Sequence, residues 1–162
     1  MITIKNFINE YNNAENELEY MNGHIKTTYV PIERKASICE AICQASMYVT
    51  DINGARYFHQ NSVARNILFV ANIIGEYTDI LFNLDEMTKN YDLLEKEGLI
   101  NVILSCLPSS ELDKFNEILK LTVDDIKENE RSFVGFMDGK VDALIDLLNH
   151  MDIPIDADQS AQ

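Results

Sequence analysis

The stretch NSVARNILFVANIIGEYTDI, residues 61–80, decides how this chain folds. Its apolar side chains recur every three to four residues and spread over nearly the whole circumference of a helix. Asn61 or Ser62 can cap the first turn, because either side-chain oxygen can accept an unpaired backbone N–H. Arg65 and Glu76 interrupt the apolar runs, which fall short of the roughly 18 residues that a membrane span needs. The pattern predicts a core helix that other elements cover on more than one side.

Helical periodicity continues on both sides of this stretch. The Asn12–Asn13 pair is a place where the first helix can break. Residues 24–30 are rich in β-branched side chains and precede Pro31, so we expect them to be extended. Helices are predicted over residues 3–23, 31–47, 61–80, 83–98, 99–107, 109–130 and 133–151, the last two either separate or joined as one bent rod. The helix over residues 31–47 should present one apolar side, formed by Ile32, Ala36, Cys39, Ile42, Cys43 and Met47.

Residues 48–59, YVTDINGARYFH, interrupt the helical pattern. Two runs of β-favouring residues flank Asn53–Gly54, the pair best suited to the positive φ angles of a type I′ turn, so we predict a β-hairpin. A lone hairpin is marginally stable in water and must lie on the helical body or on a neighbouring molecule. We expect Tyr57 and Phe58 to be exposed there and to contact a partner.

Together these elements predict a mainly α-helical (all-α) protein, a single-domain bundle of six to seven helices with one small β-hairpin near residues 48–59. A chain of 162 residues can bury a core without disulfides or metal. We place the domain at residues 1–151. Residues 152–162, which contain Pro154 and three aspartates, should form a flexible acidic tail.

The net charge of −14 is concentrated in residues 99–162, which carry 13 acidic and 5 basic side chains. Such a surface repels phosphate backbones and argues against direct nucleic-acid binding. It favours protein partners with basic surfaces, although solubility alone also explains it. Asp138, Asp142 and Asp146 lie one helical turn apart, an arrangement that slightly destabilises a helix. We therefore predict that these three aspartates bind a partner.

No set of residues in the chain matches a known catalytic or metal-binding motif. Cys39 and Cys43 are one turn apart, but structural zinc sites use four ligands, so we expect buried, reduced thiols for these and for Cys106. Asp51 and its neighbours only faintly resemble the start of a calcium loop and are explained by the turn. The histidines, read as surface residues, are His24, His59 and His150. We therefore predict a non-enzymatic protein without catalytic residues, cofactor or metal.

Four segments carry a resemblance to a known class of proteins: KTTYVP at residues 26–31, EYTDI at 76–80, YDLLEKEGLI at 91–100 and FNEILKLTVDD at 115–125. They resemble small helical proteins encoded among the virion genes of tailed phages that infect low-GC Gram-positive bacteria. The resemblance implies a head, connector or tail component, or an assembly chaperone, that acts through protein contacts, and it transfers no functional residues. The 16 Asn and 19 Ile are also typical of AT-rich coding.

The predicted partners are accordingly other virion proteins and further copies of this chain, in a homo-oligomer, with no membrane. The N-terminal residues lack a basic start followed by an apolar run, so we expect the protein in the host cytoplasm or built into the virion. The alternative is an acidic inhibitor that imitates nucleic acid and occupies the basic cleft of a host defence protein.

Overall fold

The computed structural model describes the backbone of residues 1–52 and 55–150, and its side chains except those of residues 49, 51–56, 84 and 130–150. The chain divides into two compact units, residues 1–124 and 125–162. As predicted, the described part is mainly helical, with seven α-helices and two small two-stranded sheets. In chain order the elements are β1 (Ile2–Thr3), α1 (Ile4–Asn12), α2 (Glu17–Gly23), α3 (Ile32–Ser46), β2 (Met47–Ile52), β3 (Ala55–Gln60), α4 (Ser62–Tyr77), β4 (Ile80–Leu81), the 3₁₀ turn η1 (Leu84–Glu86), α5 (Met87–Lys96), α6 (Leu99–Ser105) and α7 (Ser109–His150).

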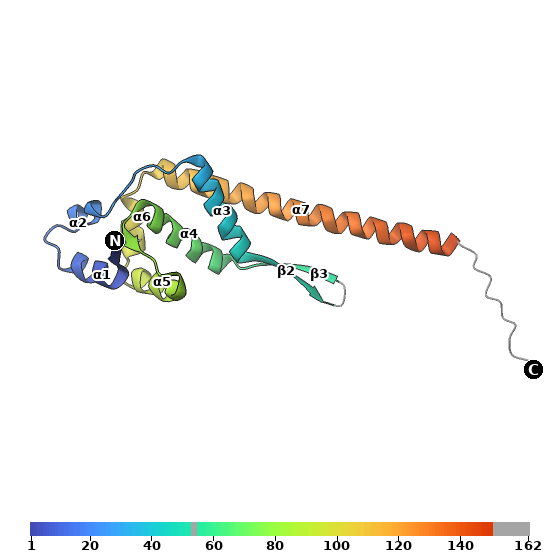
Figure 1. Cartoon of the computed structure of the whole chain (residues 1–162), viewed down its shortest axis with the longest axis horizontal. Coiled ribbons are helices and arrows are strands. Elements are labelled where there is room, and N and C mark those ends of the chain that lie inside the picture. Colours follow the sequence, from blue (N-terminus) through green and yellow to red (C-terminus); the bar gives the residue numbers. More distant parts are fainter. Residues whose placement is uncertain (53–54, 151–162) are drawn as a thin grey trace, which may run out of the picture. The chain divides into compact units, whose positions relative to one another are not determined.

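Helix α4 is the central helix that the sequence predicts. Asn61 is its N-cap, and the Asn61 side chain accepts a hydrogen bond of 2.9 Å from the backbone N–H of Ala64. The helix ends at Tyr77, three residues earlier than predicted, because Thr78 takes up an extended conformation. Figure 1 shows α4 beside α3, with the β2–β3 hairpin joining the two helices.

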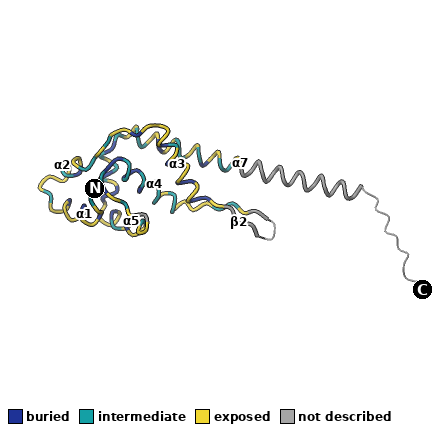
Figure 2. Tube along the Cα trace, viewed as in Figure 1, coloured by how far each residue is buried: buried dark blue, intermediate teal, exposed yellow. Residues whose placement is uncertain are grey.

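Helix α4 belongs to two hydrophobic clusters at once. Val70 and Ile74 pack into a cluster with side chains of α1, α2, α5 and α6. Ile73 and Tyr77 pack into a second cluster with α3 and with Phe115 at the start of α7. The buried trace along α4 in Figure 2 reflects this double coverage. The structure thus confirms that α4 is covered on more than one side.

The residues after α4 pair with two earlier segments, and this explains where the helix stops. Thr78 forms a β-bridge with Ile25 in the predicted extended segment. Next, β4 pairs in parallel with β1, with Ile2 opposite Ile80. Hydrogen bonds to these segments replace those of another helical turn. The sequence does not reveal this pairing, since both strands have only two residues.

The remaining helices agree with their predictions in kind and differ in detail. The first predicted helix is broken after Asn12, as its asparagine pair allowed, and α2 restarts with Asn16 as N-cap. The helix predicted from Asn83 begins as a 3₁₀ turn. Gly98, at φ 70°, makes the left-handed joint between α5 and α6. Residues 109–150 form one continuous helix, which is the joined alternative of the two that the sequence left open.

One prediction about α3 is wrong. Ile32, assigned to the apolar side, is exposed, whereas Lys35 is only 3% exposed. Lys35 turns inward because it has a half-buried carboxylate partner, described below. The type I′ turn at Asn53–Gly54 and the flexible tail at 152–162 lie outside the described residues, and the domain boundary at 151 stays a prediction. Over the described ranges, no helix is both long and apolar enough to cross a bilayer.

Candidate functional site

The β2–β3 hairpin is the candidate protein-contact site. Its register runs from Met47 opposite Gln60 to Ile52 opposite Ala55, so the two six-residue strands pair along their whole length. Within the described ranges no third strand joins this sheet, and each strand keeps one unpaired edge. A two-stranded sheet of this kind is marginal in water. The hairpin therefore offers both backbone groups and side chains to a partner.

One face of the hairpin, which we call the aromatic face, consists of Tyr48, Thr50, Tyr57 and His59. The register places Tyr48 opposite His59 and Thr50 opposite Tyr57, and alternate residues of a strand share a face. The Tyr48 and His59 rings stack with their centroids 5.0 Å apart and an interplanar angle of 15°. Thr50 Oγ1 lies 2.7 Å from His59 Nε2 and fixes the imidazole from the neighbouring position.

The tyrosines of the aromatic face are open to solvent. Tyr48 is 55% exposed and Tyr57 is 50% exposed. Tyrosine suits protein interfaces because its ring gives a large rigid contact area and its hydroxyl can find a hydrogen-bond partner. The face therefore combines two exposed rings with a stack between Tyr48 and His59 that fixes the orientation of the Tyr48 ring.

The two predicted contact aromatics lie on opposite faces of β3. Tyr57 is exposed, as predicted, and belongs to the aromatic face. Phe58 is half-buried, contrary to its prediction, because it shares the other face with buried Met47. Sequence reasoning missed Tyr48 and His59 as members of the site. Counting outward from Asn53–Gly54 would have found them, since residues equidistant from a two-residue turn face each other.

The three predicted acidic contact residues cannot be added to this surface. Asp138, Asp142 and Asp146 lie on α7, among the residues whose side chains are not described. Their role in partner binding stays a prediction.

The most strongly connected polar group in the first unit is the carboxylate of Glu111, at the start of α7. One of its oxygens, Oε2, accepts hydrogen bonds from Tyr77 Oη at 2.6 Å and from the Val30 backbone N–H at 3.0 Å, and lies 2.8 Å from Lys35 Nζ. Lys35 Nζ also lies 5.7 Å from the centre of the Phe115 ring. We call these residues the Glu111 node. It ties α3, α4 and the segment before α3 to the first turns of α7.

Within the Glu111 node, burial and hydrogen bonding shift the pKa of Glu111 in opposite directions and the pKa of Tyr77 in the same direction. Burial disfavours the charged form of Glu111, but the hydrogen bonds from Lys35, Tyr77 and the Val30 N–H outweigh it, so the pKa of Glu111 lies below its ordinary value. Burial raises the pKa of Tyr77, and its hydrogen bond to Glu111 raises it further. The node therefore holds an ionised carboxylate and a protonated phenol. Because its contacts join separate elements of the chain, we interpret the node as stabilising the fold.

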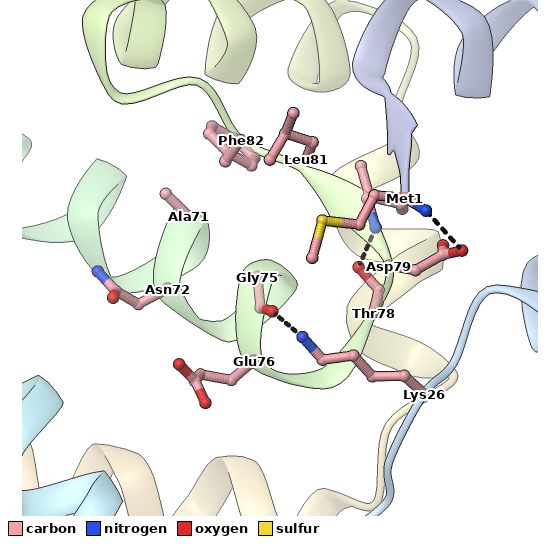
Figure 3. A pocket seen from close by; sticks show the side chains of 11 residues that line it. Met1, Lys26, Ala71, Asn72, Gly75, Glu76, Thr78, Asp79, Leu81 and Phe82 are labelled. Atoms are coloured by element: carbon pink, nitrogen blue, oxygen red, sulfur yellow. Dashed lines mark hydrogen bonds and ion pairs between the residues drawn. The ribbon is translucent and has the colours of Figure 1, made fainter.

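A cavity of about 260 Å³ lies beside the last turns of α4 (Figure 3). Its charged groups are engaged within the protein. Lys26 Nζ donates to the carbonyl of Gly75 at 2.5 Å, Asp79 Oδ1 lies 2.7 Å from His24 Nδ1, and Glu76 pairs with Arg34. Lys26 thus places a cation at the C-terminal end of α4, where the helix dipole favours it. These contacts fasten the helix end, so we do not assign the contact site to this cavity.

The predicted cysteines and histidines differ in burial, and His150 lies among the residues whose side chains are not described. Cys39 and Cys43 are free and buried, as predicted, whereas Cys106 is free and half-buried. Burial raises the pKa of Cys39 to about 11, which keeps its thiol protonated. His24 and His59 are not simple surface residues, because each is half-buried beside a polar partner. Among the residues described, no three His, Cys, Asp or Glu side chains gather as metal ligands would.

Comparison of the chain with protein-family models, with curated proteins and with solved structures found no match.

Proposed function

We propose that this chain is a non-enzymatic assembly protein of a tailed phage that infects low-GC Gram-positive bacteria. It acts through protein contacts as a head, connector or tail component or as an assembly chaperone, in the host cytoplasm or within the virion. The observation that carries the proposal is the aromatic face, which leaves Tyr48 and Tyr57 half exposed on a two-stranded sheet. Such a face gains from being covered.

Two further features support a role in contacts with other proteins. The resemblance of residues 26–31, 76–80, 91–100 and 115–125 to phage virion-cluster proteins implies an assembly role. The net charge of −14 steers the chain towards basic protein surfaces and away from nucleic acid. In this proposal the helical unit holds the hairpin in place, and the hairpin supplies the contact.

The test is co-expression of the tagged chain with each head, connector and tail protein encoded beside it, followed by purification at moderate salt. We expect one or more of these proteins to co-purify. The variant Tyr48→Ser/Tyr57→Ser should retain at least tenfold less of the partner, because it removes both exposed rings. A matched control, Leu18→Ser/Leu121→Ser, removes two equally exposed apolar side chains outside the hairpin and should retain the partner.

A native chain that stays strictly monomeric and retains none of these proteins would contradict the proposal. Equal loss in both double variants would move the contact away from the hairpin.

The excess of acidic residues in 99–162 supports a second candidate, an inhibitor that imitates nucleic acid and binds a basic cleft of a host defence protein. This candidate predicts binding that weakens steeply with salt. It also predicts a loss of affinity in the triple variant Asp138→Asn/Asp142→Asn/Asp146→Asn. Unchanged affinity in that variant would argue against it.

A further inference from the structure

The outer edge of β3 carries backbone groups that no strand of the hairpin uses. The Asn61 N–H donates to the Ser46 carbonyl at 2.8 Å at the base of the hairpin. In an antiparallel ladder, hydrogen-bonded and non-hydrogen-bonded pairs alternate. Counting from Ser46 and Asn61, the pairs Met47–Gln60 and Val49–Phe58 are therefore non-hydrogen-bonded. On β3, Phe58 and Gln60 thus turn their N–H and C=O groups outward, away from β2.

This alternation limits how a second β3 strand can pair with the first. In an antiparallel pair of identical strands about a two-fold axis, only outward-facing residues can meet as hydrogen-bonded partners. Centring the axis on Phe58 pairs the residues from Arg56 to Gln60 with their counterparts in the partner. Centring it on Tyr57 or His59, as a non-hydrogen-bonded pair, hydrogen-bonds only two of the three outward-facing residues of β3 (Arg56, Phe58 and Gln60), and centring it on Arg56 or Gln60 pairs fewer residues of the strand. The backbone therefore favours one register, with Phe58 opposite the partner's Phe58.

The same register is also favourable for the side chains. It places Tyr57 opposite the partner's His59 on the aromatic face. Since Tyr48 already stacks on His59, Tyr48, His59 and the partner's Tyr57 then line up across three neighbouring strands, and the partner's Thr50 takes the position on the fourth. Arg56 falls opposite the partner's Gln60, so no like charges face each other. Aromatic pairs in these positions stabilise a sheet.

The distribution of charge indicates which molecule covers this edge. Residues 47–60 contain one acidic side chain, Asp51, and one basic side chain, Arg56, which are cross-strand neighbours, while the whole chain carries −14. Two copies repel each other over most of their surface but not at the hairpin. The hairpin also contains no Lys or Pro, the residues that commonly protect an edge strand from pairing. A second copy therefore fits this edge better than a strongly charged foreign strand.

We propose that two copies of this chain pair through the outer edges of β3, antiparallel and centred on Phe58, so that their hairpins form one four-stranded sheet. The inference rests on the proposed function, for which it names the chain itself as one partner of the hairpin. The pairing also stabilises the hairpin, since four strands are more stable in water than two.

The first test is disulfide trapping of the full chain in a Cys106→Ser background. Across the two-fold axis, Phe58→Cys brings two thiols together at about 5.5 Å between Cα atoms, within reach of a disulfide. The matched control Gln60→Cys lies on the same strand and face, two residues away, and its two copies are too far apart. We expect Phe58→Cys to form a covalent dimer under mild oxidation and Gln60→Cys to stay monomeric. Equal cross-linking of both variants, or none in either, overturns the proposed register.

The second test is sedimentation equilibrium of the unmodified chain. We expect a monomer–dimer equilibrium that Phe58→Lys weakens at least tenfold, because it places two ammonium groups opposite each other. Leu18→Lys introduces the same charge at an exposed site on α2 and should leave the equilibrium unchanged. A native chain that is monomeric at its highest soluble concentration overturns the self-pairing. If that monomer still co-purifies with a virion protein, the proposed function stands and only the identity of this partner is wrong.

Discussion

Around Glu111, side chains from α3, α4 and α7 close over a carboxylate, whereas around Tyr57 the β2–β3 hairpin leaves aromatic rings open to solvent. The Glu111 node satisfies its hydrogen bonds within the chain. Within the described residues, the hairpin has a strand edge that no third strand joins and a face that leaves Tyr48 and Tyr57 exposed. Buried polar residues here are paired within the fold, whereas the residues of the proposed contact site are exposed on a two-stranded sheet. The following predictions test that division.

The largest expected effect belongs to the Glu111 node. Glu111→Gln leaves the Lys35 ammonium buried without its counter-charge, so the free energy of unfolding should fall by about 3–5 kcal/mol. Chemical denaturation measures this loss. The control Glu117→Gln removes an exposed partner of Lys114 on the same helix and should cost no more than about 1 kcal/mol. Similar losses in the two variants would mean that the node does not support the fold.

A smaller loss of stability is expected for a core substitution, and comparing it with a hairpin substitution tests whether the two regions contribute differently to stability. Ile74→Ala removes a fully buried side chain of α4 and should destabilise the protein by about 2–5 kcal/mol. Tyr57→Ser, measured at low protein concentration so that the proposed pairing does not contribute, should change the free energy of unfolding by about 0.5 kcal/mol or less. A large loss for Tyr57→Ser would show that the hairpin is part of the folded core, and the comparison would fail.

The N-cap of α4 should contribute less to the free energy of unfolding than the Glu111 node or Ile74 does. Asn61→Ala removes the side-chain oxygen that accepts the Ala64 N–H and should cost about 1 kcal/mol in thermal or chemical denaturation. Asn101→Ala, at an exposed position inside α6, is the matched control and should be close to neutral. Equal effects at the two positions would indicate that the cap is not formed in solution.

The smallest expected effect is a dependence on pH. The pKa of Glu111 is lower in the folded chain than in the unfolded chain, so its contribution is fully present above its ordinary pKa of 4.5 and is lost as pH falls through the folded value. The difference in unfolding free energy between the native chain and Glu111→Gln should therefore shrink below pH 4.5. A constant difference down to strongly acidic pH would contradict the direction of this pKa shift.

Most of the fold could be predicted because the signals that specify it come from residues close to one another in the sequence. The helical spacing of apolar residues located α4, and Asn53–Gly54 located the hairpin, because both signals are local. The burial of Lys35 was not predictable, since it depends on Glu111, which lies far along the chain. The pairing of Ile2 with Ile80 was missed for the same reason. Of the candidate site, Tyr57 was identified from sequence, but membership of the aromatic face required the register between β2 and β3.

The pairing of β1 with β4 also constrains the order in which the chain can fold during synthesis. Ile2 and Thr3 leave the ribosome well before Ile80 and Leu81, their strand partners. Helix α1 packs against β4 and against α5, which is made after β4. Phe7, fully buried in the finished protein, therefore has no complete binding surface until α5 and α6 have emerged. During that interval Ile4, Phe7 and Tyr11, which the finished protein buries, lack the neighbours that cover them.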